Sequence, residues 1–280
     1  LPKGYQISQY DKPFVEGGML NTIRIRRIHL EEDAGSLIHD NASLVDFNRA
    51  GTPLMELVTE PDITSADEAV AFCQELQRIL RYLDISDADM ERGLMRLEAN
   101  ISINKGTKVE IKNINSFKAL RDAIGYEEQR QQSALSRGKK IAQETRGWNA
   151  DKQKTVSQRT KEEARDYRYL TEPDLPPLDA SAFDIQKIKT EIPELPAQKR
   201  ERFMKEYELS KTEADIVTQD RRIAEFFEEA ASELAEITPQ PPTLNPIRLL
   251  YNYFTSDLWG LMKKEGMIFE ELRVTPAHLA

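Results

Sequence analysis

Carboxylates on predicted strands are the residues of this sequence whose types and spacing best suit chemistry. In GTPLMELVTEPD (51–62), β-branched and apolar residues predict a strand, and period-2 alternation places Glu56 on one face between Leu54 and Val58. Burying an ionised carboxylate costs several kcal/mol unless a cation, a metal or strong donors meet it. Glu56 is therefore the first candidate site residue.

A second set of acids follows a strand predicted over residues 21–32. Midway along this strand the apolar residues switch from odd-numbered to even-numbered positions, which a β-bulge at Arg26-Arg27 would explain. After that bulge His29, Glu31 and Asp33 share one face, whereas Glu32 falls on the other. The run from Glu31 to Asp33 could present carboxylates to a cation, and a solvated acidic turn is the alternative.

A charged face is also predicted for a β-hairpin over residues 95–113, where apolar and polar residues alternate. A three-residue loop over 104–106, with Gly106 in the left-handed conformation, pairs Ile101 with Val109. The same register sets polar partners opposite each other: Asn100 against Glu110, and Glu98 against Lys112. Alone, this face predicts a solvated charge pair worth about 0.2–1 kcal/mol. Together with Glu56 and the acidic turn, it could gather the oxygen ligands that Mg²⁺ prefers.

Helices are predicted on either side of this hairpin. One begins at the capping-box sequence Ser65 to Glu68 and runs to about residue 83, with Cys73 in its apolar stripe as a structural thiol. The other spans about 117–137, and its polar middle, 127–132, is expected to be solvated. Residues 143–155 are expected to form a loop.

Cations and prolines mark the next part of the chain. Arg159, Lys161 and Arg168 could supply donors to an anionic substrate or phosphate, and surface ion pairs are the alternative. Clustered prolines predict a linker over 179–196 between a first domain, 1–178, and a helical domain, 197–280.

Composition limits the function classes. Hydrophobic residues make up 39% of the 280 residues, and no run approaches the roughly 18 apolar residues of a membrane-spanning helix. The formal net charge of -9 argues against a general binder of phosphate backbones, although Arg24, Arg26 and Arg27 could make a local basic contact. The single cysteine fits a reducing, cytoplasmic setting. Because the chain opens at Leu1 without a methionine, we expect a missing N-terminal piece.

Several long strings resemble one family, the B subunits of the bacterial and organellar tRNA-dependent aspartyl/glutamyl-tRNA(Asn/Gln) amidotransferases. The strings are YQISQYDKPF (5–14), IHLEEDAG (28–35), VDFNRAGTPLMELVTEPD (45–62), EIKNINSF (110–117), DYRYLTEPDLPPL (166–178) and IPELP (192–196). The similarity runs from about residue 3 to the end. Strings of this length and order are far more specific than a short motif.

The resemblance implies a fold, an activity and partners. The fold would be α+β: an antiparallel-sheet cradle similar to the glutamine synthetase catalytic fold, followed by an all-α domain. The protein would use ATP and Mg²⁺ to phosphorylate the side-chain carboxylate of Glu-tRNA(Gln) or Asp-tRNA(Asn). Ammonia from the partner glutaminase, the family's A subunit, would then displace the phosphate. The expected complex is a cytoplasmic heterotrimer with this glutaminase and the small C subunit, acting on misacylated tRNA.

The resemblance also implies roles for individual residues. The expected metal ligands are acidic: Glu31, Glu32, Glu56, Glu98 and Glu110. The expected catalytic residues are Glu56, Glu98, Glu110 and Lys112. The expected ATP or substrate contacts are Lys112, Asn113, Asn115, Arg159, Lys161 and Arg168, and Asp166 is a further candidate.

The sequence also departs from the family pattern. Ser36 stands where a lysine is common, Arg92 replaces an acid, Leu97 a cysteine and Glu98 an aspartate. The family's first strand, with its Gly-Leu-Glu-x-His ligands, and its tail domain are not found, which suggests a fragment. A non-catalytic scaffold that holds tRNA and the glutaminase is therefore the alternative function. A stand-alone carboxylate–amine ligase is a third.

Overall fold

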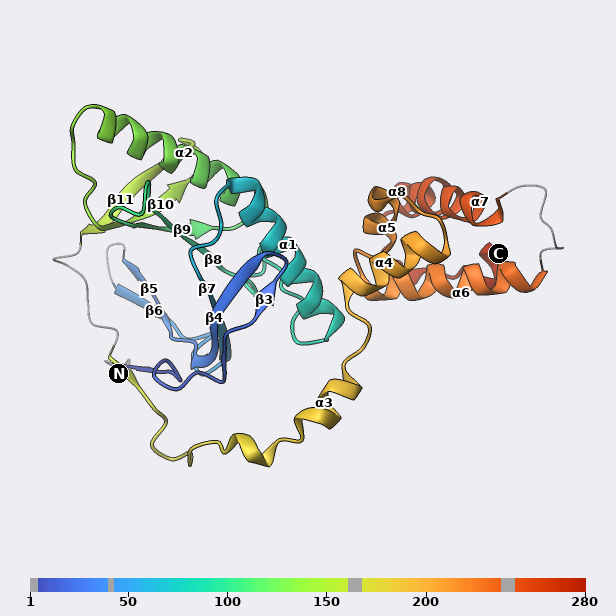
Figure 1. Cartoon of the computed structure of the whole chain (residues 1–280), viewed down its shortest axis with the longest axis horizontal. Helices are drawn as coiled ribbons and strands as arrows, with labels where there is room; N and C mark the ends of the chain where they lie inside the picture. Colours follow the sequence, from blue (N-terminus) through green and yellow to red (C-terminus); the bar gives the residue numbers. More distant parts are fainter. Residues whose placement is uncertain (1–4, 40–42, 161–167, 238–244) are drawn as a thin grey trace. The chain divides into compact units, whose positions relative to one another are not determined.

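The chain divides into two compact units (Figure 1). The computed structural model describes residues 5–39, 43–160, 168–237 and 245–280. Unit 1 comprises Leu1–Leu76 and Asp89–Phe183, and unit 2 comprises Gln77–Ala88 and Asp184–Ala280. Each unit is described by itself.

Unit 1 combines short sheets with helices. Its strands are β1 (Gln6–Ile7), β2 (Val15–Glu16), β3 (Met19–Leu20), β4 (Ile23–Glu32), β5 (Ser36–His39), β6 (Ser43–Asp46), β7 (Pro53–Thr59), β8 (Leu97–Ile101), β9 (Val109–Ile114), β10 (Glu144–Asn149), β11 (Lys154–Thr160) and β12 (Tyr169–Leu170). Helix α1 (Ala66–Tyr82) starts in unit 1, and α2 (Phe117–Ser136) lies within it. Both helices begin where the sequence predicts, since Ser65 accepts from the amide of Glu68 and Ser116 from that of Ala119.

One of the two four-stranded sheets of unit 1 has the strand order β11-β10-β9-β8. It is mixed rather than purely antiparallel, because β10 runs parallel to β9 while the other pairs are antiparallel. A parallel pair needs a long crossover, and α2 provides it. The prediction of an α+β fold with antiparallel pairing is thus confirmed only in its coarse form.

The core of this unit lies on one face of that sheet. Buried side chains come from α1, α2, β9 and β10: Ala69, Val70, Ile111, Ile114, Ala119, Leu120, Ala123 and Trp148. Cys73 packs against this cluster, and burial raises the pKa of its thiol to about 11, as expected for a structural cysteine. The opposite face of the sheet is left to the charged side chains of β8 and β9.

The β8–β9 hairpin has the predicted register near its loop. Ile101 pairs with Val109 and Asn100 with Glu110. Two details of the prediction are wrong. The left-handed positions of the loop are Asn104 and Lys105 rather than Gly106. Farther along, a register shift makes both Lys112 and Asn113 face Glu98, and Asn113 takes φ 63° there.

A buried charge network joins α2 to β10 and β11. Glu127 is fully buried and accepts hydrogen bonds from Arg130 Nη2 at 2.6 Å, Gln131 Nε2 at 2.9 Å and Thr155 Oγ1 at 3.1 Å. The prediction of a solvated helix middle is therefore wrong. The prediction of a loop over 143–155 is wrong too, because β10 pairs with β11 and supplies Arg146, 3.7 Å from Glu127.

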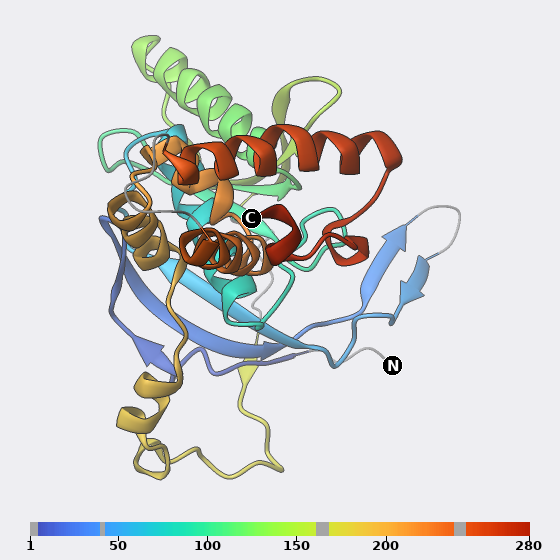
Figure 2. The same ribbon diagram turned by 90° about the vertical axis from the view of Figure 1, so that its right-hand side faces the viewer.

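The second sheet of unit 1 is built around the long strand β4. Strands β2 and β3 pair with one edge of β4, and β7 pairs with the other. A register shift between Ile25 and Arg27 confirms the predicted β-bulge, with Arg26 as the extra residue. Beyond the bulge His29 lies opposite Glu56. The β5–β6 hairpin extends away from this sheet (Figure 2).

Unit 2 is helical, as the periodicity predicts. Its helices are α3 (Ile185–Glu191), α4 (Pro196–Glu206), α5 (Lys211–Val217), α6 (Arg221–Ile237), α7 (Pro246–Asn252), α8 (Trp259–Glu265) and α9 (Pro276–Leu279), with a π-helical turn, Tyr253–Leu258, between α7 and α8. Thr275 caps α9 by accepting from the amide of His278. Phenylalanines 203, 227 and 254 form the centre of its core. Among the described residues, no helix is both long and apolar enough to cross a membrane.

Candidate functional site: a histidine and two glutamates on adjacent strands

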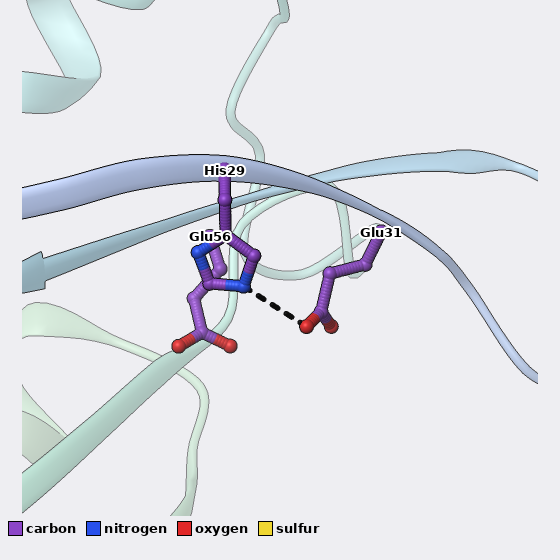
Figure 3. A group of neighbouring side chains, drawn as sticks. All are labelled: His29, Glu31 and Glu56. Atoms are coloured by element: carbon purple, nitrogen blue, oxygen red, sulfur yellow. Dashed lines mark hydrogen bonds and ion pairs between the residues drawn. The ribbon is translucent and has the colours of Figure 1, made fainter. Parts of the chain in front are cut away.

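Three side chains converge where β4 pairs with β7. His29 and Glu31 come from β4 and Glu56 from β7, and one potential ligand atom from each lies within 4.8 Å of the others (Figure 3). Two local facts produce this arrangement. Strand alternation beyond the bulge puts His29 and Glu31 on the same face, and the antiparallel register sets Glu56 directly opposite His29.

Glu31 is a buried carboxylate held by three donors. Its side chain is only 4% exposed. Gln6 Nε2 donates to Oε2 at 2.8 Å, Ser8 Oγ donates to Oε1 at 2.8 Å, and His29 Nε2 lies 3.0 Å from Oε1. A carboxylate has about four lone-pair sites, so one remains for a further partner. The predicted alternative of a solvated acidic turn is wrong for Glu31.

His29 orients this carboxylate. The imidazole is fully buried, and its Nδ1 has no hydrogen-bond partner among the described residues. A buried N–H without an acceptor is rarer than an acceptor without a donor. We therefore assign the proton to Nε2, which then donates to Glu31. In this tautomer the imidazole supports Glu31, and carboxylate oxygens of Glu31 and Glu56 are the atoms that fit Mg²⁺.

The pKa of Glu56 is raised above its ordinary value. Burial is the largest cause, and the charges of Glu31 and Glu98 add to it, while His29 and Arg27 act in the opposite direction. The side chain is nevertheless 43% exposed. Glu56 is thus a carboxylate held at an energetic disadvantage, open on one side, and next to a second carboxylate. A bound divalent cation would relieve that repulsion.

Glu56→Gln should make the metal-free protein more stable at neutral pH. Because the folded pKa lies above the unfolded value near 4.5, the folded state loses stability as the pH rises between these two pKa values, and the loss is complete above the folded pKa. Glutamine removes this loss. In thermal unfolding with EDTA, the variant should melt higher than wild type at pH 7, and the difference should shrink towards pH 4. A difference in melting temperature that does not vary with pH would contradict a raised pKa of Glu56.

Asp33 links the two sheets of unit 1. It is buried and pairs with Arg49 Nε at 2.8 Å and Arg96 Nη2 at 2.7 Å. Arg49 also donates to the carbonyl of Gly93 at 2.6 Å. Since Arg96 directly precedes β8, these contacts bring β8 towards the end of β4. They explain why the charge of Glu98 reaches Glu56.

The polar face of β8 and β9 contributes a second group. Lys112 Nζ lies 2.9 Å from Glu98 Oε1 and 3.6 Å from Glu110 Oε1, and Glu110 also accepts from Thr145 Oγ1 at 2.7 Å. The predicted cross-strand charge pair is present. The bulge residue Asn113 is exposed, and its amide lies over Gly147, where a Cβ would come within 2.9 Å of Nδ2.

The other residues selected from the sequence are more scattered. Glu32 follows Glu31 on β4 and is not part of the three-residue cluster. Asn115 is exposed and precedes the cap of α2. The backbone of Arg159 pairs with Thr145, and Arg168 is exposed with φ 46°. Lys161 and Asp166 lie outside the described residues.

Sequence reasoning did not select His29 as a site residue. It placed His29 on the face of Glu31, but a single histidine on a strand carries little information by itself. The stronger signal was the combination of the parity change at the bulge with the strand containing Glu56. The pairing of β4 with β7, which sets His29 opposite Glu56, joins distant residues and is not specified by the local pattern.

The chain is similar to known proteins over its whole length. A model of the GatB/GatE catalytic domain matches residues 1–186. Over the whole chain, the B subunits of the aspartyl/glutamyl-tRNA(Asn/Gln) amidotransferases of Rickettsia conorii and Persephonella marina are each 46% identical, and that of Thermomicrobium roseum is 44% identical. The chain spans only 59–60% of the length of these relatives. Because the family model matches residues 1–186, more than half of the 280 residues, the chain belongs to the GatB family.

Proposed function

We propose that the chain is the carboxylate-activating part of the B subunit of a tRNA-dependent amidotransferase. The substrate is the side-chain carboxylate of glutamate or aspartate esterified to tRNA(Gln) or tRNA(Asn), and ATP is the phosphoryl donor. The observation that carries the proposal is the pair of carboxylates, Glu31 and Glu56, which lie close together beside His29, with His29 hydrogen-bonded to Glu31. The family membership and the names of the relatives support it.

The proposed reaction balances in two steps. In the first, a carboxylate oxygen attacks the γ-phosphorus of ATP, so that RCOO⁻ and ATP⁴⁻ give the acyl phosphate RCO–OPO₃²⁻ and ADP³⁻. In the second, ammonia attacks the acyl carbon and the C–O bond to phosphate breaks. The acyl phosphate and NH₃ then give RCONH₂ and HPO₄²⁻. The protein's contribution to such transfers is mainly positioning and charge neutralisation.

The described side chains suit these tasks. Glu31 and Glu56 would hold Mg²⁺, which supplies neutralising charge to the phosphates when bound. Glu98 and Glu110, two further predicted acids of this site, orient Lys112 by ion pairs. Lys112 is a donor for phosphate or substrate oxygens, and Asn113 is a neighbouring donor. We keep Glu32, Asn115, Arg159, Lys161 and Arg168 as proposed contacts of the same pocket.

The proposal extends to the fold and the partners. We propose that the two sheets of unit 1 form a cradle similar to that of glutamine synthetase. The relatives are named as B subunits, which supports assembly with two further proteins, a glutaminase and the small C subunit. We place the complex in the cytoplasm, where misacylated tRNA is its substrate. Ammonia would come from glutamine hydrolysed by the glutaminase.

Trapping the acyl phosphate tests this function. Hydroxylamine is added to the chain assembled with its two proposed partner proteins, with Glu-tRNA(Gln), ATP and Mg²⁺. Wild type should form Glu-hydroxamate in an ATP-dependent way, and Glu56→Gln should form it at least about 10²-fold more slowly. Glu60→Gln is a suitable control, because Glu60 is ion-paired to Arg26 on the same sheet.

Other outcomes would point to the alternatives. If wild type forms no hydroxamate but the complex still binds tRNA, the protein is a scaffold. If free glutamate is converted without tRNA, it is a stand-alone carboxylate–amine ligase. If Glu56→Gln matches wild type, the assignment of the site is wrong.

A further inference from the structure

Strand β4 carries three arginines whose side chains are used differently. Arg24 places Nε and Nη2 on the carboxylate of Asp62, at 2.8 and 2.6 Å. Arg26 places the same two nitrogens on Glu60, at 2.9 and 2.8 Å. Both pairs lie at the surface, and in both the bidentate edge of the guanidinium is occupied. These two arginines are therefore committed to surface ion pairs.

Arg27 lies on the face of the candidate site. Because Arg26 is the extra residue of the bulge, Arg27 shares its face with His29 and Glu31. Its side chain is 17% exposed. The guanidinium carbon lies 4.2 Å from the centre of the Tyr10 ring, which stacks in turn on Tyr169. The aromatic rings thus fix the plane of the cation beside the carboxylates.

In Arg24 and Arg26 the edge formed by Nε and Nη2 is hydrogen-bonded to a carboxylate, whereas the same edge of Arg27 is not. Nε is buried and has no hydrogen-bond partner among the described residues. Nη2, on the same edge, is 4.0 Å from Glu56 Oε1, which is too long for a hydrogen bond. A buried N–H donor left unmet is costly, and its position in a native structure calls for a partner. An anion that approached from the side of Glu56 would meet this donor.

We infer that Arg27 binds the oxygens of the transferred phosphoryl group through Nε and Nη2. The inference rests on the proposed function, which brings a phosphoryl group to the carboxylates beside Arg27. The fixed fork of a guanidinium matches two oxygens of a phosphate. Arg27 thereby neutralises one side of the group while the cation held by Glu31 and Glu56 neutralises another. Because both positive groups are in place before the transfer begins, they need no reorganisation while the phosphoryl group moves.

The activity test compares adjacent arginines. Arg27→Lys keeps the charge but loses the fork, and it should lower the kcat of ATP-dependent hydroxamate formation about 10²–10³-fold. Arg26→Lys, changed in the same way at the next position, should remain within about twofold because Arg26 serves only a surface ion pair. Arg27→Gln, which has no charge, should be at least as impaired as Arg27→Lys. Thermal melting of each variant reports whether the fold is kept.

A binding test keeps this inference separate from the proposed function. Inorganic phosphate is titrated into the chain with Mn²⁺ present, and paramagnetic broadening of the ³¹P resonance reports phosphate close to the cation. Arg27→Lys and Arg27→Gln should weaken phosphate binding at least about tenfold, and Arg26→Lys should not. Unchanged phosphate binding would overturn the inference, even if Mn²⁺ binding fell, because Arg27 would then only position Glu56. If the wild-type complex forms no hydroxamate but binds phosphate through Arg27, the proposed function is overturned and this inference is not.

Discussion

Replacing Glu31 by glutamine is expected to lower the kcat of carboxylate activation about 10²–10³-fold. Glutamine keeps the shape of the side chain but removes its charge and places an NH₂ group among existing donors. Gln6, Ser8 and His29 all point hydrogen-bond donors at this carboxylate in the assigned tautomer. The change therefore removes an oxygen ligand and creates a donor–donor conflict at a buried position.

The readout for Glu31→Gln is single-turnover formation of Glu-hydroxamate in the assembled complex. Glu60→Gln again serves as the control, and a retained near-wild-type melting temperature distinguishes loss of chemistry from loss of folding. Glu31→Asp keeps the charge but withdraws it by one methylene, so it should retain more activity than Glu31→Gln. Equal activity of wild type and Glu31→Gln would exclude Glu31 from the reaction.

Removing the buried carboxylate of Glu127 should have the largest effect on stability. Glu127→Ala removes the buried carboxylate that pairs with Arg130 and Arg146 and leaves Glu144 as their remaining shared partner. Breaking a buried ion pair by deleting one member typically costs about 3–5 kcal/mol. We expect a loss of this size in the free energy of unfolding of unit 1. Glu128→Ala, an exposed neighbour, should change it by less than about 0.5 kcal/mol.

Urea unfolding measures this effect. The chain has two tryptophans, and Trp148 belongs to the core of unit 1. In a Trp259→Phe background, fluorescence therefore reports on unit 1 alone. The midpoint of Glu127→Ala should fall well below that of Glu128→Ala. A double-mutant cycle with Arg130→Ala should show that the effects of the two changes on the free energy of unfolding are not additive. Independent, additive effects would contradict a shared network.

The sequence predicted the parts of this fold that depend on local pattern. Alternation predicted the β8–β9 pairing at Ile101 and Val109, and the parity change on β4 predicted the bulge. Helix caps were predictable for the same reason, because Ser65 and Ser116 act on residues three positions away. These features require no knowledge of distant parts of the chain.

Features that depend on distant partners were not predictable in this way. The acids and amides in the middle of α2 have the pattern of a solvated face, because nothing local shows that Arg146 and Thr155 meet Glu127. The β10–β11 hairpin was missed because its strands lack apolar alternation. The approach of Glu98 to Glu56 depends on the pairing of Asp33 with Arg96, 63 residues away.

Titration with Mn²⁺ followed by electron paramagnetic resonance measures whether Glu31 and Glu56, with His29 supporting Glu31, hold a divalent cation. Wild type should bind a single Mn²⁺ ion that Mg²⁺ displaces. Glu31→Gln and Glu56→Gln should each weaken this binding at least about tenfold, and Glu60→Gln should leave it unchanged. Equal Mn²⁺ affinity in all four proteins would contradict the account.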